Sequence, residues 1–197
     1  GIRPTTTWAA NEAMARAMAV LAGGAGIGLV TLHAGFLPHD REDPEREHMV
    51  KRLQLLAKIF DDQGVSIAFE TGQESADTLL EVLGDIDRDT VGVNFDPANM
   101  ILYGAGDPLE AMDLLGPYIR SVHCKDARYE RDGGQPWYED CPLGEGDVDM
   151  EAFLRRLHSL GYTGALTIER EYSPDQAGDL GAALSLLREL RAKILGT

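Results

Sequence analysis

The sequence predicts an α/β fold with parallel strands, of the (β/α)8-barrel type, in which five strand–helix units are visible. Short β-branched runs alternate with segments of helical period, which indicates parallel strands covered by helices. Each run ends in polar residues, as the strands of a barrel do at its catalytic rim. An open flavodoxin-like sheet also fits the alternation, but the polar strand ends favour the barrel. No strand is followed by a dinucleotide or phosphate-loop glycine motif.

The elements follow one another in a regular order. An Ala-rich helix opens the chain, and Gly64 and Gly161 stop two later helices, while Asp107 before Pro108 starts another. The stretch 127–147 is predicted to be one long loop that forms a wall or lid of the site. The predicted strands are 28–35, 65–72, 90–97, 119–126 and 164–171, and the later helices are 42–63, 75–84, 107–116, 149–160 and 175–195.

The chain is short for the fold it predicts. A complete barrel needs about 250 residues, and this sequence has 197. We therefore expect residues 1–197 to form a single barrel domain that lacks its first three βα units. Five parallel strands leave two edges unpaired, so upstream residues or another chain should cover them. A homo-oligomer is the expected state.

Composition excludes several classes of protein. The net charge of −15 opposes nucleic acid binding, because that affinity comes largely from Lys and Arg on phosphates. There is no apolar run of about 18 residues, so no membrane association is expected. Two cysteines, Cys124 and Cys141, make no disulfide framework, and we expect a cytoplasmic protein.

Four strand ends carry residues suited to a metal. Glu70, Asp96, His123 and Glu169 are separated by 26, 27 and 46 residues, one unit each once the 127–147 stretch is subtracted. If the strands lie side by side, three carboxylates and one imidazole converge, a set suited to Mn²⁺, Mg²⁺ or Co²⁺, with Zn²⁺ as an alternative. Without a cation, such carboxylates would stay partly protonated. Taken singly, a glutamate could instead pair with Arg170, Asp96 could be a turn residue, and His123 could be a core histidine.

Five segments together resemble a known family. "IAFETGQES", "VGVNFDPANM", "VHCKDA", "PLGEGDVDM" and "LTIERE" occur in this order and are similar to segments of the xylose isomerase-like barrels, which include sugar and sugar-phosphate isomerases and epimerases and endonuclease IV relatives. The resemblance covers residues 28–171 and implies that the four rim residues are ligands of one divalent metal ion. It further implies that Glu70 and Glu169 transfer a proton through an enediolate.

Further residues are candidates for contacts with a sugar or sugar phosphate. The resemblance implies that His33 contacts the substrate or a second metal ion, and that Glu145 belongs to a loop that folds back over the site and contacts the substrate. Alternation puts Lys125 on the same side as His123, where its cation could meet a phosphate or enediolate oxygen, and it puts Asp126 on the other side. Gln73 and Arg128 are candidates for contacts with substrate hydroxyls.

Asn99 departs from the family pattern, because many relatives carry His there. Asn99 is a poor zinc ligand, but it can still donate a hydrogen bond and is therefore a candidate for contact with the substrate. It weakens the case for an endonuclease IV-like phosphodiesterase more than the case for an isomerase or epimerase. A lyase or dehydratase acting on a polyol or keto acid shares the first chemical step and stays open. A further alternative is an inactive barrel fragment that folds only with a partner chain.

Overall fold

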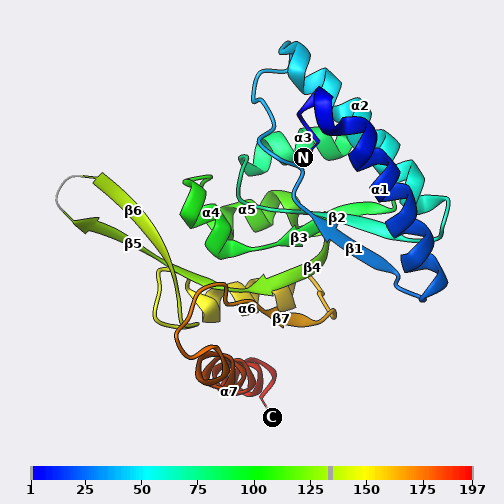
Figure 1. Ribbon diagram of the computed structural model, residues 1–197. Coiled ribbons are helices and arrows are strands. Elements are labelled where there is room, and N and C mark those ends of the chain that lie inside the picture. Colours follow the sequence, from blue (N-terminus) through cyan, green and yellow to red (C-terminus); the bar gives the residue numbers. More distant parts are fainter. Residues whose placement is uncertain (1, 133–134, 197) are drawn as a thin grey trace.

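Five parallel strands form a curled half-barrel in the computed structural model, which describes residues 2–132 and 135–196 (Figure 1). The strand order is β1-β2-β3-β4-β7, so the strands are neighbours in chain order. The predicted fold class, a partial (β/α)8 barrel, is confirmed. The strands of this sheet are β1 (Leu29–Leu32), β2 (Ser66–Glu70), β3 (Val91–Phe95), β4 (Ile119–Cys124) and β7 (Leu166–Ile168).

The central strands of this sheet are buried on both faces, as is typical of parallel strands that helices cover. All five residues of β3 are buried, and so are four of the five in β2. Asp43, Ser75 and Asp107 cap three of the helices with their side chains. The helices are α1 (Thr5–Gly24), α2 (Pro44–Asp61), α3 (Ala76–Ile86), α4 (Pro97–Tyr103), α5 (Pro108–Leu115), α6 (Met150–Ser159) and α7 (Gln176–Leu195), with a 3₁₀ turn at Gly116–Tyr118.

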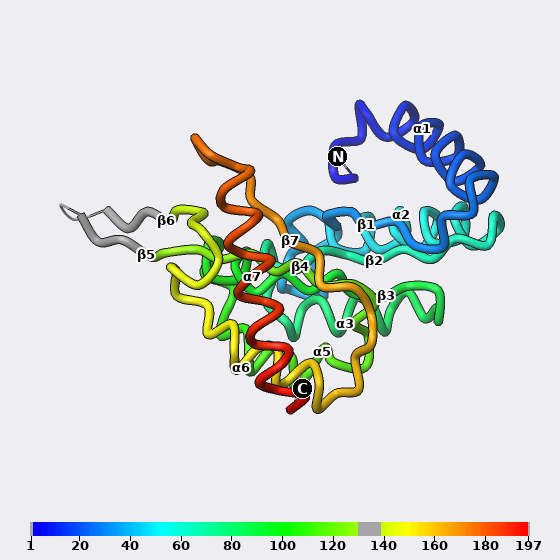
Figure 2. The backbone as a smooth tube through the Cα atoms, turned by 90° about the horizontal axis from the view of Figure 1, so that it is seen from below, coloured from blue at the N-terminus to red at the C-terminus, as the bar shows by residue number. Residues whose placement is uncertain are grey.

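The stretch 127–147 is not one long loop, and this prediction was wrong. It contains most of an antiparallel hairpin of β5 (Asp126–Asp132) and β6 (Gln135–Cys141), which projects from the half-barrel (Figure 1). In the view from below, the beginning of β5 leaves the half-barrel on the side away from α1 (Figure 2). The charged residues of this stretch suggested a loop. Two polar strands joined at a Gly-Gly pair, however, are also the composition of a solvent-exposed hairpin.

Helix α4 was also missed by the sequence analysis. Asp96 accepts a hydrogen bond from the backbone N–H of Asn99 at 3.0 Å, and Pro97 occupies the first helical position. Asp96 therefore ends β3 and caps α4 through Oδ1, which leaves its second oxygen, Oδ2, free to face the rim.

In the part of the chain that the structure describes, the two outer strands of the half-barrel, β1 and β7, each have a strand neighbour on one side only. Helix α1 packs on α2 beyond β1, while α7 packs on α6 and β7 at the opposite end (Figure 1). Among the described residues, no helix combines the length and the apolar character that crossing a membrane requires.

Candidate metal centre

The sheet brings four side chains together at the carboxyl ends of its strands. Glu70 ends β2, Asp96 directly follows β3, His123 lies near the end of β4, and Glu169 directly follows β7. Each offers one ligand atom, and these atoms all lie within 4.8 Å of one another. We call these four residues the acid–histidine cluster. Parallel strands place their carboxyl ends at the same rim, which is why residues 99 positions apart in the chain meet here (Glu169 − Glu70 = 99).

The side chains of the cluster converge on His123 Nδ1. This nitrogen lies 2.5 Å from Glu169 Oε2, 3.4 Å from Glu70 Oε1 and 3.6 Å from Asp96 Oδ2. Nevertheless, His123 Nδ1, Glu169 Oε2 and Asp96 Oδ2 are buried atoms that make no well-aligned hydrogen bond to a described residue. These polar atoms are close together but are not directed at one another as donor and acceptor. A cation among them would satisfy all three.

The electrostatics of the cluster also call for positive charge. Burial lowers the pKa of His123, but its contacts with Asp96, Glu169 and Glu70 outweigh this effect and raise the pKa to about 11. Burial raises the pKa of Asp96, whereas His123 holds the pKa of Glu169 below its ordinary value. The three carboxylates therefore need a proton on the imidazole or a cation in its place. The donor set of three carboxylates and one imidazole fits a divalent ion.

A buried lysine lies beside the cluster. Lys125 is 1% exposed, and its Nζ atom is 3.7 Å from Glu169 Oε1 and 3.9 Å from Asp96 Oδ2. It also forms a short ion pair with Glu171 and donates to Asn99 Oδ1 at 3.3 Å. Lys125 thus lies on the side of the sheet that alternation predicted, together with His123.

Asn99 holds Glu70 in place. Its amide nitrogen donates to Glu70 Oε1 at 2.8 Å, while its oxygen accepts from Lys125. Gly72 makes this approach possible, because a Cβ atom there would lie 2.5 Å from the Cβ of Asn99. The amide of Asn99, a candidate for substrate contact, is engaged by protein groups in this structure.

Two further residues of the site were missed by the sequence analysis. The amide nitrogen of Asn94 lies 3.2 Å from His123 Nε2, the ring atom turned away from the cluster, and 3.4 Å from Glu70 Oε2. The other is Glu171, the partner of Lys125. Alternation could have indicated both, because Asn94 precedes Asp96 by two positions and Glu171 follows Glu169 by two.

One alternative interpretation was that Arg170 pairs with a glutamate of the cluster, but the structure shows no such pair between the described residues. Arg170 pairs instead with Asp140 on β6 at 2.6 Å and with Asp179 on α7 at 2.8 Å. Arg170 thus faces away from the rim, and the carboxylate of Glu169 faces the cluster.

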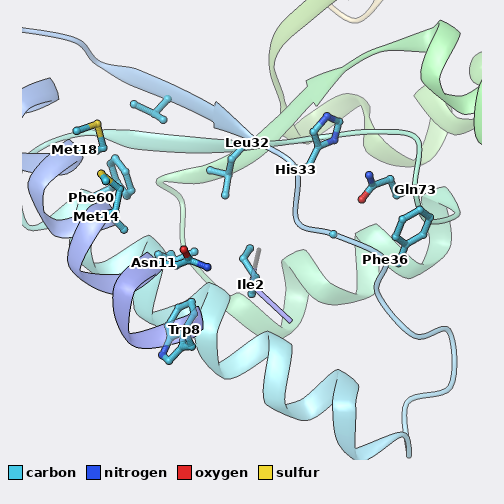
Figure 3. Close-up of a pocket in the computed structure, with 14 residues that line it drawn as sticks. Ile2, Trp8, Asn11, Met14, Met18, Leu32, His33, Phe36, Phe60 and Gln73 are labelled. Carbon is cyan, nitrogen blue, oxygen red and sulfur yellow. The ribbon is translucent and has the colours of Figure 1, made fainter. Parts of the chain in front are cut away.

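An apolar pocket opens next to the cluster. It has a volume of about 560 Å³ and lies between α1, α2 and β1. Figure 3 shows His33, Gln73 and Phe36 at one end and Trp8 with Met14 of α1 at the other. His33 Nε2 is 3.8 Å from Glu70 Oε1, so this end of the pocket adjoins the cluster. Two predicted substrate residues, His33 and Gln73, therefore lie beside the cluster.

Glu145 and Arg128 lie together at the base of the hairpin. Arg128 donates to the backbone oxygen of Glu145 at 2.6 Å, and the side chain of Glu145 is exposed. Asp126, expected on the opposite side from Lys125, accepts backbone hydrogen bonds from Gly144, Gly146 and two other residues. It thereby fastens the loop that carries Glu145 to the end of β4.

Glu74 is a buried acid outside the cluster, and its burial should make the stability of the protein depend on pH. Its Oε1 atom has no partner among the described residues, and burial raises its pKa from 4.5 to about 8. Between these values the folded chain keeps a proton that the unfolded chain has released. The free energy of unfolding should therefore fall as pH rises through this window, by a few kcal/mol at about 1.4 kcal/mol per pKa unit, and then level off.

Glu74→Gln should remove most of this slope. The measurement is urea unfolding at about pH 5 and about pH 8.5, with Glu42→Gln, an exposed acid in the loop before α2, as the control. A slope unchanged in Glu74→Gln would contradict the assignment.

The half-barrel of parallel strands, with three carboxylates and a histidine at its rim, places this protein among the barrel proteins that carry a candidate divalent-metal centre. The family model described as "Xylose isomerase-like TIM barrel" matches residues 3–190, and the chain belongs to this family.

The most informative relatives differ in their described functions. A crystal structure of a xylose isomerase domain protein from Planctomyces limnophilus is 43% identical, with a TM-score of 0.93 over 100% of this chain and 71% of that chain. An inosose dehydratase from Lacticaseibacillus casei is 25% identical, covering 79% of this chain and 56% of the relative. A D-tagatose 3-epimerase-like protein is 24% identical, with a TM-score of 0.75 over 92% and 68% of the two chains, a likeness of fold. The chain spans about half the length of the curated relatives that it matches.

Proposed function

We propose that this protein is a divalent-metal-dependent sugar or sugar-phosphate isomerase or epimerase. The observation that carries the proposal is the acid–histidine cluster, in which Glu70 at the end of β2 and Glu169 just after β7 both approach His123 Nδ1 from strands on either side of β4 in the sheet order. All four members would hold the cation, for which Mn²⁺, Mg²⁺ or Co²⁺ suits the oxygen-rich donor set best, with Zn²⁺ as an alternative. A divalent cation in this centre would supply positive charge against the negative charge that develops on the substrate oxygens.

The glutamates perform the proton transfers in this proposal. One carboxylate, Glu169 or Glu70, removes the proton from the carbon next to the substrate carbonyl, which leaves an enediolate. The other glutamate, which must enter this step in its protonated form, returns its proton to that carbon from the opposite face and so inverts it. Lys125, whose Nζ is 3.7 Å from Glu169 Oε1, stabilises the carboxylate form that accepts the proton.

The remaining candidate residues would position the substrate or the glutamates in this reaction. His33 and Gln73 would contact substrate hydroxyls from the end of the pocket next to Glu70, and Asn99 would orient Glu70. Glu145 and Arg128, at the base of the hairpin, would contact the more distant end of the substrate. The acidic chain and the engaged amide of Asn99 both disfavour a phosphodiesterase that acts on DNA.

A dehydratase is the second candidate, supported by the inosose dehydratase relative. It would begin with the same removal of a carbon-bound proton. The enediolate would then expel a hydroxyl group from the next carbon, and a protonated carboxyl group would supply the proton with which it leaves as water. A polyol-derived ketone or a keto acid is the matching substrate class.

Solvent exchange tests the proton-removal step that both candidate reactions share. The Mn²⁺-loaded protein is incubated in deuterium oxide with a set of ketoses, ketose phosphates and inososes, and products are followed by NMR. Deuterium at the carbon next to the carbonyl with an inverted centre supports the epimerase, and loss of water supports the dehydratase. Absence of exchange in every compound would contradict the proposal.

We further propose that the working form is a homo-oligomer in a reducing cytoplasm, where Cys124 and Cys141 stay free thiols. In residues 2–132 and 135–196, the outer strands β1 and β7 each present an edge that no other strand pairs with, so the chain should self-associate. Sedimentation velocity at micromolar concentration measures this directly. A single monomeric species would contradict the expectation and would favour the alternative in which a different polypeptide covers the edges.

A further inference from the structure

The strand that carries Glu169 to the cluster is weakly held by the sheet. Strand β7 has three residues, Leu166, Thr167 and Ile168, and within the described part of the chain it pairs only with β4. The last ladder contact is the backbone N–H of Glu169, which donates to the oxygen of Cys124 at 3.2 Å. A three-residue strand at an open edge does not by itself fix the direction of the side chains that follow it.

Asp140 supplies the missing support from the hairpin. Its Oδ2 atom accepts hydrogen bonds from Arg170 Nη1 at 2.6 Å and from the backbone N–H groups of Glu171 and Tyr172 at 3.0 and 3.2 Å. Arg170 Nη1 also donates to the backbone oxygen of Asp140 at 2.7 Å, and its Nε donates to Asp179 at 2.8 Å. The side chains of Asp140 and Arg170 are 8% and 10% exposed. We call this set of contacts the Asp140–Arg170 junction.

The junction determines which way Glu169 points. Arg170 is held by Asp140 on β6 and Asp179 on α7, whereas its two neighbours, Glu169 and Glu171, point to the other side. On that side Glu169 joins the cluster and Glu171 pairs with Lys125. The backbone of residues 171 and 172 is bound to Asp140, so rotation of the segment would break three of its contacts together.

We infer that Asp140 and Arg170 are positioning residues that hold Glu169 in the metal centre and thereby couple the β5–β6 hairpin to it. This inference rests on the proposed function, because it assigns the two residues a role toward the cation. Groups that orient a metal ligand without touching the metal typically change affinity by about 10- to 100-fold when they are removed.

The junction affects both the metal centre and the stability of the fold, and the two effects must be measured separately. Asp140 Oδ1 is buried without a hydrogen-bond partner among the described residues, which offsets part of what Oδ2 gains. A buried ion pair often contributes little net stability once desolvation is included, but removing one of its charges alone leaves the other unpaired and is destabilising. The test therefore uses substitutions that keep a polar side chain at each position, and it measures metal affinity beside stability.

The test is the Mn²⁺ affinity of the full 197-residue chain, measured by isothermal titration calorimetry, beside the thermal unfolding midpoint without metal. Asp140→Asn keeps an acceptor for the two backbone N–H groups but removes the charge opposite Arg170. Arg170→Lys keeps the charge but cannot reach both acids with a planar fork. Glu139→Gln, an exposed neighbour on β6, is the matched control.

Asp140→Asn and Arg170→Lys should each bind Mn²⁺ about 10-fold more weakly than the wild type, whereas Glu139→Gln should be unchanged. Wild-type affinity in a folded Asp140→Asn or Arg170→Lys protein would overturn the inference, even if the unfolding midpoint fell. If neither variant folded, the junction would be a requirement for folding, which also overturns it. If the wild type and Glu139→Gln bound no Mn²⁺, the proposed function itself would fail.

Discussion

Glu169→Gln should lower turnover by about 10²- to 10⁴-fold, the range that a positioned acid or base contributes to proton transfer. Glutamine has nearly the same shape as glutamate and keeps an oxygen that can face the cluster, but it cannot accept the substrate proton. The side chain of Glu169 is partly exposed, so the fold should persist. The measurement is deuterium exchange into whichever substrate the wild type accepts, at saturating Mn²⁺.

The control for this variant is Glu189→Gln, which makes the same change on the exposed surface of α7. Mn²⁺ affinity is measured in parallel, because Glu169 is also a candidate ligand. If turnover falls only in proportion to the loss of bound metal, Glu169 acts as a metal ligand and not as an acid or base. Turnover near that of the wild type would remove it from the chemistry altogether.

Most of the acid–histidine cluster was predictable because it depends on topology. Parallel strands in chain order must bring their carboxyl ends to one rim, and the four cluster residues each stood at or near such an end. The structure needed no unusual backbone to gather Glu70 and Glu169; it needed only the order β1-β2-β3-β4-β7. Strand periodicity and strand-end polarity were therefore sufficient.

The parts that were not predicted depend on contacts between elements that periodicity does not describe. Nothing in the local sequence says that Asp140 will meet Arg170, since they come from different elements, 30 positions apart. The hairpin resembled a loop because its strands are rich in polar residues. Asp96 was identified as a rim residue, but its second role as the cap of α4 required knowing where the chain turns.

Asp96→Asn should abolish tight metal binding and remove the stabilisation that bound metal gives the wild type. Asp96 is fully buried, and its Oδ2 atom faces His123 Nδ1 at 3.6 Å without a hydrogen bond. Asparagine can still cap α4 through Oδ1, but it would place a neutral amide where the cluster needs a charged ligand. Burial raises the pKa of Asp96, which means that the charged form of this side chain is unfavourable in the metal-free protein. Removing the charge should therefore not lower the stability of the metal-free protein.

Thermal unfolding with and without Mn²⁺ distinguishes these effects. In chelator, Asp96→Asn should unfold at or above the wild-type midpoint. At about 100 times the dissociation constant, bound metal stabilises the wild type by about 2.7 kcal/mol, which corresponds to roughly 5–10 °C for a chain of this size. The variant should show no such shift at the same concentration.

Asp107→Asn is the matched control, because Asp107 caps α5 with the same geometry at an exposed site. It should lose a little stability equally with and without Mn²⁺, since only a cap is weakened. A metal-induced shift in Asp96→Asn as large as that of the wild type would mean that the cation does not require this carboxylate. An Asp96→Asn protein much less stable than the wild type in chelator would mean that the cluster is a structural ion-pair network, because its carboxylates would then stabilise the fold without a metal.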